Sequence, residues 1–140
     1  MTRSKSIVLI DDNSVTNYLH RAMINDLDLG YEIVTCENGK LGLDFLESGF
    51  QNQSVPKLIL VDLNMPVMDG FEFIENYKAR HYNDLYPTIL AVVTTSTNPR
   101  DMERIKDLGI TSCLAKPLKK DQIMKLLENA PEKLETGTAE

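Results

Sequence analysis

The chain has 140 residues, of which 42% are hydrophobic and 26% charged, and a formal net charge of −6. This length fits one domain with a single core. The acidic balance argues against nucleic acid as a direct partner, because phosphate backbones attract clustered Lys and Arg. No apolar stretch reaches the roughly 20 residues of a membrane span, and the N-terminus has no signal-peptide core. We therefore expect a cytoplasmic protein without membrane insertion.

Strand and helix patterns alternate from the N-terminus. A first strand is predicted at 6–10, and a helix follows with Ser14 as a cap and Gly30 as its stop. One apolar stripe of this helix consists of Val15, Tyr18, Leu19, Ala22, Met23 and Leu27. A second strand is predicted at 32–36, and Asn38-Gly39 turns the chain into a second helix. The polar segment 47–56 is expected to be a loop.

The second half of the chain continues the alternation. The third strand, 58–61, is followed by Asp62, and a helix begins after Gly70. The fourth strand is predicted at 89–93. The next helix has Asn98 as its cap and Pro99 at its first position. Further elements are a helix end near 108, a fifth strand at 110–115 and a last helix at 121–129. We assign 1–130 to one domain and 131–140 to a polar tail.

Five strand–helix units predict an α/β fold. The expected architecture is flavodoxin-like and doubly wound, with a five-stranded parallel sheet in the order 2-1-3-4-5 and helices on both faces. In such a sheet, ligands bind beyond the carboxyl ends of the strands, where the strand order reverses between strands one and three.

Polar residues follow the predicted strands at that edge. They are Asp11 and Asp12 after the first strand, Asp62 after the third, Thr94 at the fourth and Lys116 after the fifth. Three carboxylates in one place repel one another and require a hard cation. Each residue also has an ordinary interpretation: the acidic pair as a helix cap, Asp62 as a turn residue, Thr95 in place of Thr94, and Lys116 as one surface lysine beside Lys119 and Lys120.

The pattern resembles the receiver domain of two-component response regulators, in the single-domain form of the chemotaxis response regulator. The resemblance covers about Ser6 to Asn129 and includes Asp62-x-Asn64-Met65-Pro66-x-Met68-Asp69-Gly70. It implies that Asp62 is the phosphoacceptor. It further implies Mg²⁺ (or Mn²⁺) bound by Asp62, by Asp12 directly, by Asp11 through water and by the backbone carbonyl of Asn64.

The resemblance also assigns the remaining site residues. Lys116 and Thr94 would bind phosphoryl oxygens, and Lys116 would pair with Asp62 before phosphorylation. Asn64 and Ser96 would tune the lifetime of the acyl phosphate, and Lys116-Pro117 is usually cis in the family. Cys113 occupies a position where many receivers have Tyr or Phe, so the switch is expected to differ there. We interpret Cys36 and Cys113 as buried thiols, with a redox role of Cys113 as the alternative.

The expected function is that of a phosphoacceptor switch in a bacterial two-component or phosphorelay system. A sensor histidine kinase or a histidine phosphotransfer protein would be the donor, and the downstream effector is unknown. A homodimer through the fourth helix, fifth strand and fifth helix is a further expectation. We expect no turnover of an external substrate. The alternatives are a phosphorylation-independent binding module of the same fold and an Asp-nucleophile phosphohydrolase of the haloacid dehalogenase type.

Overall fold

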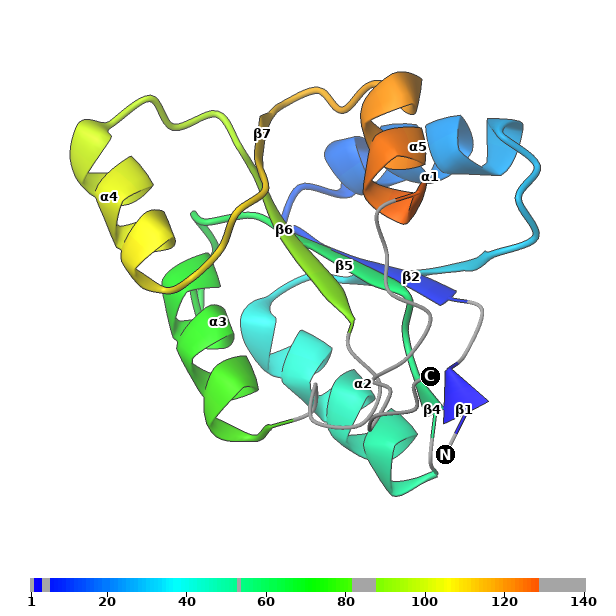
Figure 1. Ribbon diagram of the computed structural model, residues 1–140, viewed down its shortest axis with the longest axis horizontal. Coiled ribbons are helices and arrows are strands. Elements are labelled where there is room, and N and C mark those ends of the chain that lie inside the picture. Colours follow the sequence, from blue (N-terminus) through cyan, green and yellow to red (C-terminus); the bar gives the residue numbers. More distant parts are fainter. Residues whose placement is uncertain (1, 4–5, 53, 82–87, 129–140) are drawn as a thin grey trace, which may run out of the picture.

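The structure is a computed structural model that describes residues 2–3, 6–52, 54–81 and 88–128. Five parallel strands form the main sheet: β2 (Ser6–Ile10), β3 (Glu32–Cys36), β5 (Leu58–Val61), β6 (Ile89–Thr94) and β7 (Cys113–Ala115). The helices are α1 (Ser14–Asp26), α2 (Gly39–Gln51), α3 (Gly70–Ala79), α4 (Pro99–Asp107) and α5 (Lys120–Glu128). Helices α1 and α5 lie on one side of the sheet, and α2, α3 and α4 on the other (Figure 1). The predicted α/β fold class is confirmed.

The main sheet has the order β3-β2-β5-β6-β7, which is 2-1-3-4-5 when only its own strands are counted. A second sheet, absent from the prediction, pairs β1 (Thr2–Arg3) with β4 (Ser54–Val55). The predicted loop at 47–56 is wrong, because α2 continues to Gln51 and β4 follows. The helix continues because Phe50 packs against the core beneath it.

Alternation along the central strands divides the core into two layers. Val8 and Ile10 of β2 pack into the layer under α2 and α3, whereas Ile7 and Leu9 face the layer under α1 and α5. Both layers contain residues that are almost fully buried, so both faces of β2 and β5 are covered. Packed side chains therefore surround β2 and β5 on both faces up to the residues where these strands end.

Helix α1 presents much of its apolar stripe to solvent. Val15, Tyr18 and Leu19 are 64%, 69% and 56% exposed. The buried residues are Asn17, His20 and Ile24. The N-cap is Asn13, whose side chain accepts a hydrogen bond from the Thr16 N–H, so the predicted cap at Ser14 is wrong by one residue. The stripe marks a helix correctly, but of its residues Met23 and Leu27 pack against the core while its N-terminal half is exposed.

The C-terminal third differs from the prediction in its fifth strand. Only Cys113–Ala115 forms β7, because 110–112 connect α4 to the edge of the sheet. As an edge strand, β7 leaves Cys113 exposed, which corrects the prediction of a buried thiol; Cys36 is buried, and burial raises its thiol pKa to about 11. The predicted tail 131–140 lies outside the described residues. Within the described ranges, every helix is too short or too polar to cross a membrane.

Candidate functional site

Two buried carboxylates lie side by side at the carboxyl ends of the central strands. Asp11 follows β2 and Asp62 follows β5, and these strands pair in register at Ile10 and Val61. Asp11 is 5% exposed and Asp62 is 6% exposed, whereas Asp12 is exposed. One ligand oxygen from each of the three carboxylates lies within 4.8 Å of the others. The sheet thus brings together the three acidic residues of the sequence prediction.

Lys116 joins the two buried carboxylates. Its Nζ lies 2.6 Å from Asp11 Oδ2 and 3.3 Å from Asp62 Oδ1. The backbone N–H of Lys116 donates to the Thr94 carbonyl at 3.1 Å, which ties the residue to the end of β6. The Lys116–Pro117 peptide is cis, as the resemblance implies. Lys116 is therefore an ion-pair partner rather than one more surface lysine.

Burial and charge shift the titration of this cluster. Burial, followed by the negative charge of Asp11, raises the pKa of Asp62, and Lys116 opposes the shift. For Lys116, burial by itself would lower the pKa, but hydrogen bonds and charge from Asp11 and Asp62 outweigh it and raise the pKa. Burial and the opposite charge of Lys116 therefore act on the pKa of Asp62 in opposite directions, and burial outweighs the charge.

Thr94 occupies the end of β6 with its side chain turned inward. It is 3% exposed, while Thr95 is exposed. Thr94 Oγ1 accepts a hydrogen bond from the Ser96 N–H at 3.0 Å. Ser96 Oγ in turn donates to Asp101 Oδ2 at 2.7 Å, in the first turn of α4. A polar chain thus runs from the strand end to α4.

The loop from 63 to 69 folds over the edge of the sheet beside Asp62. Its backbone is closed by a hydrogen bond from the Gly70 N–H to the Leu63 carbonyl at 2.9 Å. Asp69 and Glu72 form a capping box that starts α3. Asn64 lies exposed in this loop, two residues beyond Asp62.

Val67, in the same loop, has a left-handed backbone that is strained for a β-branched residue. Its φ is 69° and its side chain is 76% exposed, so no packing compensates the strain. We expect Val67→Gly to raise the free energy of unfolding by about 0.5–1 kcal/mol, the strain relief less the entropy cost of glycine. Urea unfolding of the parent and the variant measures this change in the free energy of unfolding. Val67→Ala, which keeps a Cβ, serves as the control; a gain as large as that of the glycine variant would show that Cβ strain is not the cause.

Sequence reasoning missed two polar residues behind the carboxylates. Asn17 Nδ2 donates to the Asp11 carbonyl at 2.9 Å, and His20 lies one turn further along the buried face of α1. It also missed that Lys116 lies closer to Asp11 than to Asp62. The available signal was the spacing of Asn17, His20 and Ile24, which places all three on one face of a helix.

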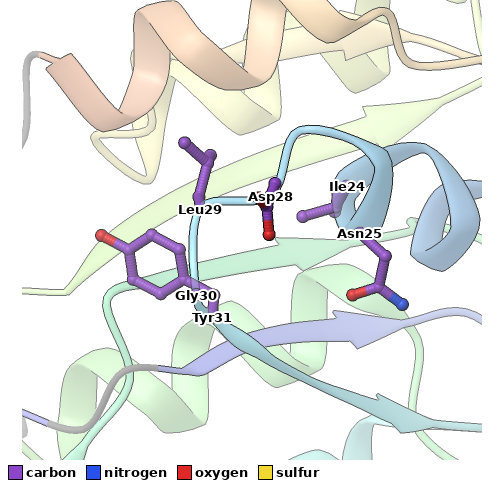
Figure 2. A pocket seen from close by; sticks show the side chains of 6 residues that line it. All are labelled: Ile24, Asn25, Asp28, Leu29, Gly30 and Tyr31. Atoms are coloured by element: carbon purple, nitrogen blue, oxygen red, sulfur yellow. The ribbon is translucent and has the colours of Figure 1, made fainter.

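A separate hollow lies at the other end of the sheet and carries no comparable chemistry. It measures about 150 Å³ and is lined by Ile24, Asn25, Asp28, Leu29, Gly30 and Tyr31. Figure 2 shows these residues on the last turn of α1 and on the segment that leads from it to the amino end of β3. Asp28 is its single carboxylate, so the acidic cluster remains the candidate site.

The acidic cluster fits a divalent cation of the Mg²⁺ type. Magnesium prefers oxygen ligands and binds proteins through one or two carboxylates while it keeps several waters. Buried Asp11 and Asp62 with exposed Asp12 offer such oxygens on the open side of the site. A doubly wound sheet with this pocket at its switch point is the arrangement that the resemblance to receiver domains implies.

Comparison with known proteins agrees with this class. Residues 7–128 match the family described as the response regulator receiver domain, and the chain belongs to that family. It is 30% identical to the probable methanogenesis regulatory protein FilR2 of Methanothrix harundinacea, over 90% of this chain and 81% of the relative. It is 32% identical to part of the sensor histidine kinase CheAY of Helicobacter pylori, over 79% of this chain and 13% of the kinase.

A solved structure gives the same result. A two-component response regulator from Cytophaga hutchinsonii superimposes with a TM-score of 0.77 at 26% identity, covering 88% of this chain and 93% of that one. The protein is therefore a response regulator receiver domain of two-component signalling.

Proposed function

We propose that Asp62 accepts a phosphoryl group from a histidine donor and that the acyl phosphate switches a partner-binding face. The observation that carries this proposal is the position of Asp62: a buried carboxylate directly after a central strand, paired with Lys116 and beside two more carboxylates. A carboxylate in this setting is a nucleophile with its counter-charges already in place. Membership of the receiver family supports the same role.

The proposed reaction is a nucleophilic displacement at phosphorus. One Asp62 oxygen attacks the phosphorus of a phosphorylated histidine, the O–P bond forms as the P–N bond breaks, and the electron pair goes to the imidazole nitrogen. Phosphoryl transfer needs mainly positioning and charge neutralisation. When bound, Mg²⁺ (or Mn²⁺) would neutralise phosphoryl oxygens.

Five residues have proposed roles around this reaction. Asp12 would hold the metal directly, Asp11 through water, and Asn64 through its backbone carbonyl. Lys116 would move its ammonium from the carboxylates toward a phosphoryl oxygen, and Thr94 would donate its hydroxyl to another. Since Thr94 now accepts from the Ser96 N–H, engagement with phosphate would alter the chain of contacts that leads to Asp101 in α4.

Neighbouring residues are proposed to set the lifetime and the output. Asn64 and Ser96 flank the phosphoryl position and would tune hydrolysis. Cys113, exposed on β7 where many receivers carry an aromatic residue, would leave the readout to α4 and the edge strand. A homodimer through α4, β7 and α5 is one form that this readout would take.

The donor and the cellular location follow from the proposed reaction and the family. We propose a cytoplasmic domain of 1–130 with a sensor histidine kinase or histidine phosphotransfer protein as donor, and no turnover of an external substrate. The similarity to a segment of a sensor histidine kinase supports that donor class. The message would pass to a separate effector protein, to a further phosphotransfer protein or to another subunit.

Transfer to Asp62 is tested with Mg²⁺ and a small phosphoramidate donor. The intact mass should increase by one phosphoryl group in the parent and stay unchanged in Asp62→Asn. Asp69→Asn is the matched control, because asparagine also caps a helix and Asp69 lies outside the cluster. Labelling of Asp62→Asn equal to the parent would refute the assignment, and release of many phosphates per protein from a phosphomonoester would favour a phosphohydrolase.

A further inference from the structure

We propose that His20 is a positioning residue for Lys116, acting through a hydrogen bond that holds the loop after β7 against α1. The inference rests on the proposed role of Lys116 at the phosphoryl site. His20 touches neither carboxylate of the site in a hydrogen bond recorded for the described residues. Its proposed role is to fix the position of the Lys116 ammonium group.

The loop that carries Lys116 has few backbone anchors. Lys116 N–H donates to Thr94 on the β6 side at 3.1 Å. Pro117 has no N–H to donate. Leu118 N–H donates to His20 Nε2 at 3.2 Å, across 98 residues of sequence. The loop is thus held on one side by β6 and on the other by His20.

The shortest ion pair in the site joins Lys116 and Asp11. Two residues on the buried face of α1 form hydrogen bonds with the backbone at or near these two partners. Asn17 fixes the Asp11 backbone by donating to its carbonyl at 2.9 Å. One turn along, His20 fixes the loop of Lys116, whose Nζ lies 2.6 Å from Asp11 Oδ2. Asn17, His20, Asp11 and Asp62 also line one small cavity of about 10 Å³. The helix therefore sets the separation between the lysine and the carboxylates.

The hydrogen bond defines the chemical state of His20. A ring nitrogen that accepts cannot carry the proton, so His20 is neutral with its hydrogen on Nδ1. Burial is the main cause that lowers the pKa of His20, which favours this neutral form. His20 is 7% exposed, so an apolar side chain here would leave the buried Leu118 N–H without a partner.

Two substitutions of His20 distinguish loss of the hydrogen-bond acceptor from loss of side-chain packing. In His20→Gln the amide oxygen reaches nearly as far as Nε2 and can accept from Leu118. In His20→Leu the volume is kept but the acceptor is lost. We expect His20→Leu to slow phosphorylation by phosphoramidate roughly tenfold, because small misplacement of a reacting group is costly. His20→Gln should restore the rate to within about threefold, the effect of part of one hydrogen bond.

The ¹⁵N resonances of the Leu118 amide and the Lys116 ammonium are read in the same variants without donor. We expect both to shift in His20→Leu and to return toward the parent in His20→Gln. If His20→Leu does not fold, His20→Asn replaces it, since its shorter amide does not reach Leu118. Ile24→Val, buried on the same helix, controls for packing.

A phosphorylation rate and resonances in His20→Leu equal to those of the parent would overturn the inference. Equal slowing of phosphorylation in His20→Leu and His20→Gln would also overturn it. A parent that accepts no phosphoryl group would refute the proposed function instead. The Lys116 and Leu118 resonances alone would then decide whether His20 positions the loop.

Discussion

Replacing Lys116 by methionine is expected to slow phosphorylation of Asp62 about 10²–10³-fold, the cost of removing one charged group from a developing transition state. The substitution keeps an unbranched side chain that ends at the position of Cε, and it removes the charged ammonium group. Lys116 Nζ pairs with both Asp11 and Asp62, and among the described residues no other Lys or Arg pairs with either carboxylate. Phosphoramidate labelling followed by intact mass gives the rate.

The same substitution is expected to lower the free energy of unfolding at pH 7 by about 3 kcal/mol, since it leaves two buried carboxylates facing each other. The loss depends on pH. Asp62 already has a raised folded pKa, so its ionised form costs stability as pH rises above the unfolded value of 3.8. Without Lys116 that cost grows, and the deficit should be smallest near pH 4 and largest at neutral pH.

Lys116 itself does not titrate in this range. Its pKa is raised from 10.5, so its stabilising contribution is present below that value and is lost only in more alkaline solution. Urea unfolding from pH 4 to 8 measures the deficit. Lys119→Met, on an exposed neighbour, is the matched control and should leave the unfolding curve unchanged. A deficit independent of pH would contradict the assignment of the effect to the carboxylates.

The second large effect is expected for Gly70→Ala. A Cβ at Gly70 would lie 2.3 Å from the Asp62 carbonyl oxygen and 2.8 Å from Leu63 Cα. Both are backbone atoms, so relief of the clash must displace the backbone at Asp62 and Leu63 or the start of α3. We expect a loss of about 3 kcal/mol or more in the free energy of unfolding, at the upper range of overpacking costs, together with slower labelling of Asp62.

Gly30→Ala gives the contrast for this prediction. Gly30 has φ 79° but no atom within 4 Å of a built Cβ, so its substitution tests backbone strain without a clash. We expect a cost of about 1 kcal/mol there, typical of a left-handed residue, and labelling at the parent rate. Equal costs at Gly30 and Gly70 in urea unfolding would show that the backbone contact at Gly70 is not the cause.

The arrangement of the acidic cluster was predictable because it depends on strand ends rather than on side-chain packing. Apolar runs locate β2 and β5, and parallel pairing brings their carboxyl ends together whatever the helices do. Asp11 and Asp62 meet for that reason.

The orientation of α1 was not predictable in the same way. An apolar stripe normally faces the core, but here Tyr18 and Leu19 are exposed while Asn17 and His20 are buried. The reason lies in hydrogen bonds to residues outside the helix. Asn17 donates to the Asp11 carbonyl and His20 accepts from the Leu118 N–H, and neither partner is evident from the helix sequence alone. Likewise, Cys113 is exposed because β7 is an edge strand, which depends on the order of the sheet.

The position of β7 in the sheet has a consequence for local unfolding. Among the described residues, β2 and β5 each pair with strands on both sides, whereas β7 pairs with β6 alone, through three residue pairs. Edge segments with few backbone hydrogen bonds open at lower free energy than the centre. The repelling carboxylates are thus fixed by the most protected strands, while their cation follows the least protected one. Opening of β7 would withdraw Lys116 and leave Asp11 and Asp62 uncompensated, so the site itself opposes fraying of the edge that follows it.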